Sequence, residues 1–137
     1  MVEMNVGMPD PSRESTVFDA VGGMVFFERL VDRFYEGVAS DPVLLALYPD
    51  QIDLGPARAR LTLFLAQYWG GPTTYSDERG HPRLRMRHAP FVIGEVERDH
   101  WLVAMRVALD ESGLEGYVRD RVWSYFEMAA DAMRNVE

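Results

Sequence analysis

The stretch Gly80-His-Pro-Arg-Leu-Arg-Met-Arg-His88-Ala-Pro-Phe91 places one imidazole, that of His88, beside an apolar ring and among arginines. The chain carries 14 basic residues and a net charge of −8, and this short segment holds a cluster of them: Arg79, Arg83, Arg85 and Arg87. A neutral imidazole is a good ligand for a transition metal. Guanidinium groups suit a dianionic group that must be held in place. The stretch therefore indicates a metal in an organic carrier that ends in two carboxylates.

A simpler interpretation makes His88 an ordinary half-buried side chain and the arginines a solvated face. The surrounding residues favour the metal site. Leu84 and His88 are four positions apart, so they share one face of a short helix that we expect Pro82 to open. Met86 and Phe91 add apolar surface suited to the underside of a flat ring. Haem, a flat ring around an iron atom, is such a carrier.

The composition is that of one globular domain with room for a cofactor. Of the 137 residues, 47% are hydrophobic and 26% are charged. The net charge of −8 argues against a nucleic acid or an anionic membrane as partner. The absence of cysteine excludes disulfides, thiolate-ligated iron, iron–sulfur clusters and cysteine nucleophiles. All basic residues are arginine, which excludes Schiff-base lysines and a P-loop.

Residues 1–15 are polar, contain Pro9 and Pro11, and lack the basic start and apolar run of a signal peptide. We expect a flexible leader there, followed by a globular domain over residues 16–137. No apolar run approaches the ~18 residues that a membrane span requires. These features favour a cytoplasmic location.

Apolar residues recur at helical spacing between glycine and proline positions. The spacing predicts a helix over about 24–39 whose buried stripe holds Phe27, Leu30, Val31, Phe34, Tyr35 and Val38. Asp41-Pro42 predicts the capped start of a short helix that ends before Pro49. Three more stripes begin near Ala57, Trp101 and Val118. No run alternates as a strand would, so the fold class is all-α, and residues 70–82 are predicted to form a long polar loop.

Other patterns compete with the His88 site. Glu97 and His100 have the Glu-x-x-His spacing of di-iron carboxylate bundles, but such sites need a second copy, and a solvated helix start is the favoured alternative. His81 either lies on a surface loop or touches an anionic group. The three large rings of Tyr35, Tyr48 and Trp101 either pack in the core or point their polar tips into one pocket. Spacing leaves both alternatives open.

Several longer strings carry a resemblance to a known family. They are Phe18-Asp-Ala-Val-Gly-Gly23, Arg33-Phe-Tyr-Glu-Gly-Val38, Leu47-Tyr-Pro49, Phe64-Leu-Ala-Gln-Tyr-Trp-Gly-Gly-Pro72, Tyr75-Ser76, the segment from Arg79 to Phe91, and Glu97-Arg-Asp-His-Trp101. With these strings the chain resembles the truncated haemoglobins, specifically their second (O-type) group, over about residues 16 to 135. The resemblance implies a two-over-two helical sandwich, a shortened globin fold that encloses haem b.

The resemblance also implies that His88 is the proximal ligand of the iron. We expect the other ring nitrogen of His88 to donate to the carbonyl of Leu84, one turn back. The residues expected at the haem propionates are Arg60, Arg85, Arg87, Tyr75 and His81, with Arg60 ranked first. The residues expected to pack on the macrocycle are Phe64, Met86 and Phe91.

On the distal side the resemblance places Tyr35, Tyr48 and Trp101 around the bound ligand. Ala57 stands where many globins have a distal histidine, and Leu61 lines the pocket one turn further. Ligand stabilisation is then left to Tyr48 and Trp101. The loop of residues 50–54, just before Ala57, departs from the family pattern.

Two hydrogen-bond donors to a partly negative ligand contribute about 3–4 kcal/mol together. Such a contribution slows ligand release by roughly 10² to 10³, which suits a poor carrier. The expected function is therefore tight binding of dioxygen and other diatomic ligands for detoxification of nitric oxide or peroxide, as a nitric-oxide dioxygenase or a peroxidase-like enzyme.

Two alternatives remain. One is an oxygen or ligand sensor or store without turnover, and the other is an all-α interaction module that has lost its cofactor. The enzyme alternative needs an electron-donor reductase as partner, since no reductase domain is encoded in the chain. A homo-oligomer is also compatible with the sequence.

Overall fold

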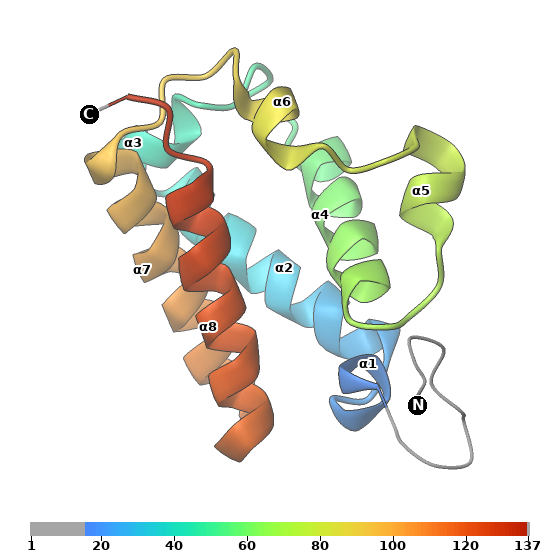
Figure 1. Ribbon diagram of the computed structural model, residues 1–137. Helices are drawn as coiled ribbons and strands as arrows, with labels where there is room; N and C mark the ends of the chain where they lie inside the picture. Colours follow the sequence, from blue (N-terminus) through green and yellow to red (C-terminus); the bar gives the residue numbers. More distant parts are fainter. Residues whose placement is uncertain (1–15, 137) are drawn as a thin grey trace.

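The computed structural model describes residues 16–136, and all of the regular structure in this range is helical (Figure 1). The helices are α1 (Val17–Ala20), α2 (Met24–Ala39), α3 (Pro42–Leu45), α4 (Gly55–Tyr68), α5 (Thr74–Arg79), α6 (Leu84–His88), α7 (Glu95–Glu111) and α8 (Gly116–Ala132). The all-α prediction is confirmed. The predicted leader of residues 1–15 lies outside the described residues. In the described range no helix is both long and apolar enough to cross a membrane.

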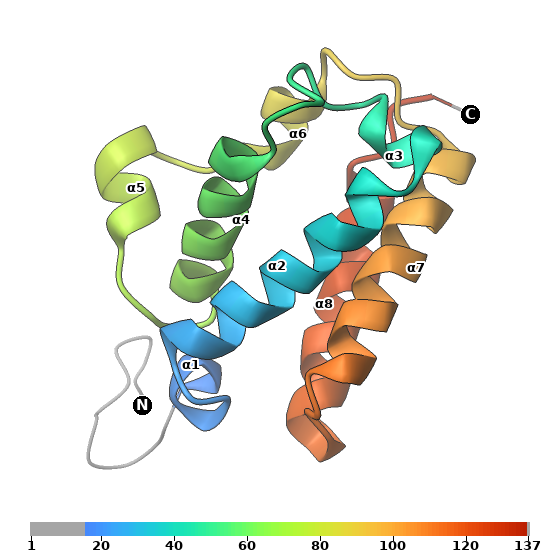
Figure 2. The ribbon, with the colours of Figure 1, turned by 180° about the vertical axis from the view of Figure 1, so that it is seen from behind.

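Helix α2 lies at the centre of the fold and contacts both α4 and α7. Its predicted stripe is fully buried: Phe27, Leu30, Val31, Phe34, Tyr35 and Val38. Burying one large apolar side chain contributes about 1.5–3 kcal/mol, so this single helix supplies much of the core. Figure 2 shows α2 crossing between α4 on one side and the pair of α7 and α8 on the other. Two helix pairs, α2 with α4 and α7 with α8, make the two-over-two sandwich that the sequence predicts.

The turn after α2 follows its sequence signal. Asp41 Oδ1 accepts hydrogen bonds from the amides of Val43 at 2.9 Å and Leu44 at 3.4 Å, and Pro42 occupies the first turn of α3. Helix α3 then ends at Leu45, before Pro49 as predicted. The cap satisfies two amides that the helix itself leaves without partners.

The prediction of a helix-poor loop over residues 70–82 is wrong in its middle, where α5 (Thr74–Arg79) forms. Two tertiary contacts explain the helix. The amide of Ser76 donates to Oε1 of Gln67 at 3.0 Å, and the ring of Tyr75 is only 5% exposed because it packs edge-on against Phe64. The polar composition of this segment gave no local signal for a helix, because the helix is stabilised by its contacts with α4.

The start of the His88 helix also differs from the prediction. Helix α6 begins at Leu84, because Arg83 adopts the left-handed conformation with φ of 44° and cannot extend the helix backwards. Pro82 therefore lies outside the helix that it was expected to open. None of the residues of α6 is buried, so packing alone does not position this helix.

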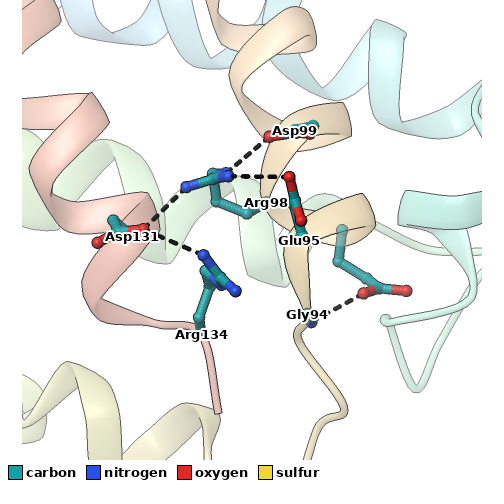
Figure 3. A network of polar contacts seen from close by, with 7 residues as sticks. Gly94, Glu95, Arg98, Asp99, Asp131 and Arg134 are labelled. Carbon is teal, nitrogen blue, oxygen red and sulfur yellow. Dashed lines mark hydrogen bonds and ion pairs between the residues drawn. The ribbon is translucent and has the colours of Figure 1, made fainter. Parts of the chain in front are cut away.

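A network of charged side chains joins the start of α7 to the end of α8 (Figure 3). Arg98 contacts Asp99 at 2.7 Å and Asp131 at 2.8 Å, and Arg134 lies 3.7 Å from Asp131. Each exposed pair contributes at most about 1 kcal/mol. Beyond the end of α8, the amides of Asn135 and Val136 donate to the carbonyl of Ile93, in the loop that follows α6.

Candidate functional site

His88 is the last residue of α6, and its imidazole is half-buried. Nδ1 lies 2.7 Å from the carbonyl oxygen of Leu84, which is the acceptor that the sequence predicts. A carbonyl can only accept, so Nδ1 carries the proton and Nε2 keeps its lone pair. In the described part of the chain nothing forms a hydrogen bond with Nε2. The ring of Phe91 stands beside the imidazole, with centroids 6.5 Å apart. This geometry fixes His88 in one tautomer and leaves the lone pair of Nε2 available to bind a metal.

Arg87 holds the loop before α6 in place. Its Nε donates to the carbonyl of Pro82 at 2.6 Å, and its Nη2 donates to the carbonyls of Arg79 at 2.9 Å and His81 at 3.2 Å. Charged donors form the stronger hydrogen bonds in proteins, about 1.5–3 kcal/mol each. Arg87 thus positions the His88 segment, and only its Nη1 is left for the propionate contact predicted from the sequence.

Asn135 holds the other side of the same segment, and sequence reasoning missed it. Its Nδ2 donates to the carbonyl of Phe91 at 2.7 Å and to that of His88 at 3.4 Å. Its Oδ1 accepts from the amide of Ile93 at 2.9 Å, and its own amide donates to the Ile93 carbonyl at 2.9 Å. An amide side chain can donate and accept at once, which suits it to this clamp. No signal in the sequence indicates that the tail returns to residues 91–93.

The residues predicted at the propionates lie in different environments. Tyr75 is buried against Phe64, with ring centroids 5.6 Å apart. His81 is exposed, and its Nδ1 accepts from the amide of Arg83 at 3.1 Å. Arg85 is exposed, as is Met86, at 58%. These placements leave the propionate contacts and the packing of Met86 on the macrocycle as predictions.

Helix α4 has two apolar faces. One faces α2: Arg58 reaches Asp32 and Tyr35 of α2, and Thr62, Leu65, Ala66 and Trp69 are buried. The other carries Ala57, Leu61, Phe64 and Tyr68 at helical spacing, and only Phe64 on it reaches burial, at 9% exposed. Phe64 contacts Tyr75 of α5, and Tyr68 contacts Tyr125 of α8. The second face therefore looks towards the region between α5 and α8, and it contains the predicted cofactor-lining residues.

Two of the predicted distal residues meet directly. The hydroxyl of Tyr48 lies 3.4 Å from that of Tyr35, and the two rings stand edge to face with centroids 5.7 Å apart. A separation of 3.4 Å is long for an O–H···O hydrogen bond. The bond is therefore weak, and either hydroxyl can turn to a better acceptor.

Both hydroxyls keep their protons. Burial raises the pKa of Tyr35, against the hydrogen bond from Tyr48 and the charges of Arg60 and Arg58. Burial and the neighbouring Tyr35 raise the pKa of Tyr48 well above its usual range, against the charge of Arg60. The guanidinium of Arg58 lies 5.9 Å from the centre of the Tyr35 ring. A phenol with a raised pKa stays a hydrogen-bond donor throughout the physiological range.

Trp101 joins the same cluster through one intervening ring. Its indole packs against Phe34 of α2 with centroids 5.2 Å apart and against Phe126 of α8 at 5.7 Å, while Phe34 contacts Tyr35 at 5.0 Å. Trp101 is half-buried, unlike Phe34, which is fully buried. The structure thus brings the three predicted distal rings into one aromatic cluster, with Trp101 on its less buried side.

His100 has a structural role that the sequence did not reveal. Its Nδ1 lies 2.8 Å from Oδ2 of Asp41, so it ties α7 to the capping residue of α3. Glu97 accepts from the amide of Gly94 at 2.8 Å and caps α7. Within the described residues no group of three or more His, Cys, Asp or Glu side chains could hold a metal ion. The di-iron interpretation lacks its ligands. The His100 side chain is 41% exposed, in keeping with a solvated helix start, and it also contacts Asp41.

Comparison with known proteins gives the family. Residues 16–135 match the family model described as bacterial-like globin. The group 2 truncated hemoglobin YjbI of Bacillus subtilis (strain 168) is 42% identical over 118 residues, covering 86% of this chain and 87% of the relative.

Two solved structures are similar throughout the domain. A thermostable hemoglobin from the actinobacterium Thermobifida fusca has 58% identity and a TM-score of 0.87, covering 89% of this chain and 98% of its own. The truncated oxygen-avid haemoglobin from Bacillus subtilis has 41% identity and a TM-score of 0.83, covering 88% of this chain and 100% of its own. The helical sandwich, the matched range and these identities agree. The chain belongs to the bacterial-like globin family, and within it to the group II truncated haemoglobins.

Proposed function

We propose that this chain binds haem b through Nε2 of His88 and holds dioxygen or another diatomic ligand tightly on the opposite side of the ring. Membership of the family implies haem binding. The observation that carries the proposal for this chain is the 2.7 Å contact between Nδ1 of His88 and the Leu84 carbonyl. That contact fixes the tautomer and raises the basicity of the coordinating nitrogen, as in other histidine-ligated metal sites.

The residues around His88 fit the group. A single imidazole supplies one bond to a metal whose other ligands belong to a macrocycle. The half-buried apolar face of α4, with Ala57, Leu61 and Phe64, suits one side of a flat ring. Phe91 lies next to the imidazole and suits the other side. Arg60, Arg85 and the remaining Nη1 of Arg87 are the cations proposed for the propionates, with Tyr75 and His81 as further contacts.

Bound haem supplies an iron atom at which a diatomic ligand gains partial negative charge. Tyr48 and Trp101 are proposed as its hydrogen-bond donors, with Tyr35 behind Tyr48. The raised pKa values of Tyr35 and Tyr48 keep both phenols protonated, which supports this role. The solved relative from Bacillus subtilis is described as oxygen-avid, and the proposed donors give a physical reason for the same property here.

Slow release suits chemistry on the ligand better than oxygen transport. We therefore propose nitric-oxide or peroxide detoxification, with a separate reductase as electron donor. The alternative is a sensor or store, which would have the same site but no turnover. Consumption of nitric oxide by the ferrous, oxygenated protein with a reductase present separates the two, because a sensor or store would not sustain consumption beyond one equivalent.

The haem site is tested by His88→Ala, with His100→Gln as the matched control, because His100 contacts Asp41 and is not among the proposed haem contacts. Wild-type protein mixed with hemin should show a Soret band, and His88→Ala should lose it or bind hemin far more weakly. Added imidazole should restore the band, since it replaces the missing ligand. His100→Gln should keep the band. An unchanged spectrum in His88→Ala would show that iron is ligated elsewhere.

A further inference from the structure

Three aromatic rings outside the distal cluster join the end of α4 to the middle of α8. Tyr68 and Tyr125 lie with centroids 4.1 Å apart and planes inclined by 31°. Trp69 packs edge-on against both, at 5.0 Å from Tyr68 and 5.6 Å from Tyr125. Aromatic pairs in proteins usually stand 4.5–7 Å apart, so the two phenol rings are unusually close. Two phenol rings in such close contact are near enough for an electron to pass between them.

The three rings differ in what they can do after losing an electron. The guanidinium of Arg121 lies 5.6 Å from the centre of the Trp69 ring, and its positive charge opposes a positive charge on the indole. The Nε1 of Trp69 is buried and has no hydrogen-bond partner within the described residues, so its proton has no acceptor. Oxidation of Trp69 to an indole radical is therefore disfavoured.

Tyr68 and Tyr125 differ in the solvent exposure of their side chains. An oxidised phenol becomes a strong acid and must pass its proton to a base or to water. Tyr125 is half-buried, and burial together with the charge of Tyr68 raises its pKa. Tyr68 is 48% exposed, so water can take its proton. Of the three rings, Tyr68 is the one at which a neutral radical can form.

Tyr68 also continues the face of α4 that is proposed to line the haem. Phe64 lies one turn before it on the same face, with ring centroids 6.1 Å apart. The face therefore runs from the proposed cofactor through Phe64 to a half-exposed phenol. A path of this kind connects a buried redox centre with the surface.

We propose that Tyr68, in close contact with Tyr125, is a second redox site through which the haem-loaded protein oxidises small phenolic reductants with hydrogen peroxide. The proposal rests on the proposed haem binding. Bound haem would supply the redox chemistry, with hydrogen peroxide as the oxidant: breaking its O–O bond to give two waters requires two electrons and two protons. Tyr68 supplies one electron and its hydroxyl proton, and a phenolic reductant restores both to it. A second round supplies the second electron and the second proton. In total, two reductant molecules each lose the hydrogen atom of an O–H bond and leave as radicals.

The experiment treats the haem-loaded protein with hydrogen peroxide and a nitrone spin trap, then locates the adducts by peptide mass spectrometry. The adduct is expected on Tyr68 and should disappear in Tyr68→Phe. Tyr117→Phe is the matched control, because Tyr117 is 75% exposed and belongs to no ring pair of this cluster. This control should keep the adduct on Tyr68. Peroxide-driven oxidation of a small phenol should fall in Tyr68→Phe and not in Tyr117→Phe.

Other results would overturn the proposal. An adduct on Tyr117 with Tyr68 unmodified would mean that exposure alone selects the site. Tyr125→Phe keeps the stacked ring and should keep the Tyr68 adduct, which gives a second variant if Tyr68→Phe does not fold. A normal Soret band with adducts elsewhere would overturn only the Tyr68 site. A wild-type protein without a Soret band would overturn the haem proposal and this one together.

Discussion

The two sides of the proposed site are held by different forces. On the proximal side, residues 79–93 carry few buried side chains, and hydrogen bonds from Arg87, Asn135 and His88 to main-chain carbonyls keep the segment in place. On the distal side, Phe34 is fully buried and Tyr35 is 4% exposed, and ring packing holds the cluster. The distal hydroxyls and the indole N–H therefore belong to rings that are held by core packing rather than by these polar groups.

Different consequences follow for mutation. On the distal side, a hydrogen-bond donor can be removed while its aromatic ring is kept. Such a change should affect ligand binding and leave the fold intact. A proximal donor fixes the main chain itself, so its loss should alter both the position of His88, the proposed iron ligand, and the stability. The following predictions test that contrast.

Trp101→Phe should have the largest effect on ligand release. The substitution removes the N–H donor but keeps an aromatic ring against Phe34 and Phe126. Loss of one hydrogen bond to a charged acceptor, about 1.5–3 kcal/mol, should speed oxygen release roughly 10- to 100-fold in a stopped-flow experiment. The melting temperature should change little by comparison. Trp123→Phe is the control, since Trp123 lies on α8 beside Arg106, and an equal acceleration there would refute the role of Trp101.

Asn135→Ala should lower the stability and alter the proximal bond at once. The loss of its side-chain hydrogen bonds should cost about 1–2 kcal/mol, or a melting temperature lower by roughly 3–8 °C. The iron–histidine stretching band in the resonance Raman spectrum of the ferrous protein should shift or broaden. Val136→Ala is the control, because it keeps the tail and the Asn135 amide. A lower melting temperature with an unchanged band would limit Asn135 to a structural role.

The sequence predicts the local features of the molecule far better than the contacts between residues far apart in the chain. The stripe on α2, the Asp41 cap and the Leu84 acceptor follow from local spacing, and the structure has all three. Each depends on residues within one helix or one turn.

The missed features join residues far apart in the chain. Asn135 meets residues 88–93 more than forty positions away, and His100 meets Asp41 across 59 positions. A polar side chain has many acceptable partners, so its type and spacing do not select one. The helix α5 was missed for a related reason, because Gln67 and the burial of Tyr75 stabilise a locally polar segment.

A smaller effect is expected at the tyrosine pair. Tyr35→Phe removes one neutral hydrogen bond of about 0.5–1.5 kcal/mol and should speed oxygen release by roughly 2- to 10-fold. Tyr48→Phe removes a proposed donor to the ligand and should reach about 10-fold, the lower end of the range for a charged acceptor. Because the hydroxyls lie 3.4 Å apart, the double variant should cost less than the sum of the two single ones. Fully additive effects would mean that the two phenols act on the ligand independently.

The smallest effect concerns the bond between α3 and α7. Although burial acts against it, the hydrogen bonds from His100 and the amides of Leu44 and Val43 hold the pKa of Asp41 below its usual value of 3.8. A lowered pKa stabilises the fold above the unfolded-state value, and this contribution disappears as the pH falls through the folded-state value. Asp41→Asn keeps a good helix cap but removes the charge. Wild type should therefore be more stable by up to about 1 kcal/mol near neutral pH, with the difference shrinking below about pH 4 in urea titrations. His100→Gln should reduce the same difference, since it removes the partner. A difference that stays constant from pH 7 to pH 3 would mean that the carboxylate charge contributes nothing, and that Asp41 acts only as a cap.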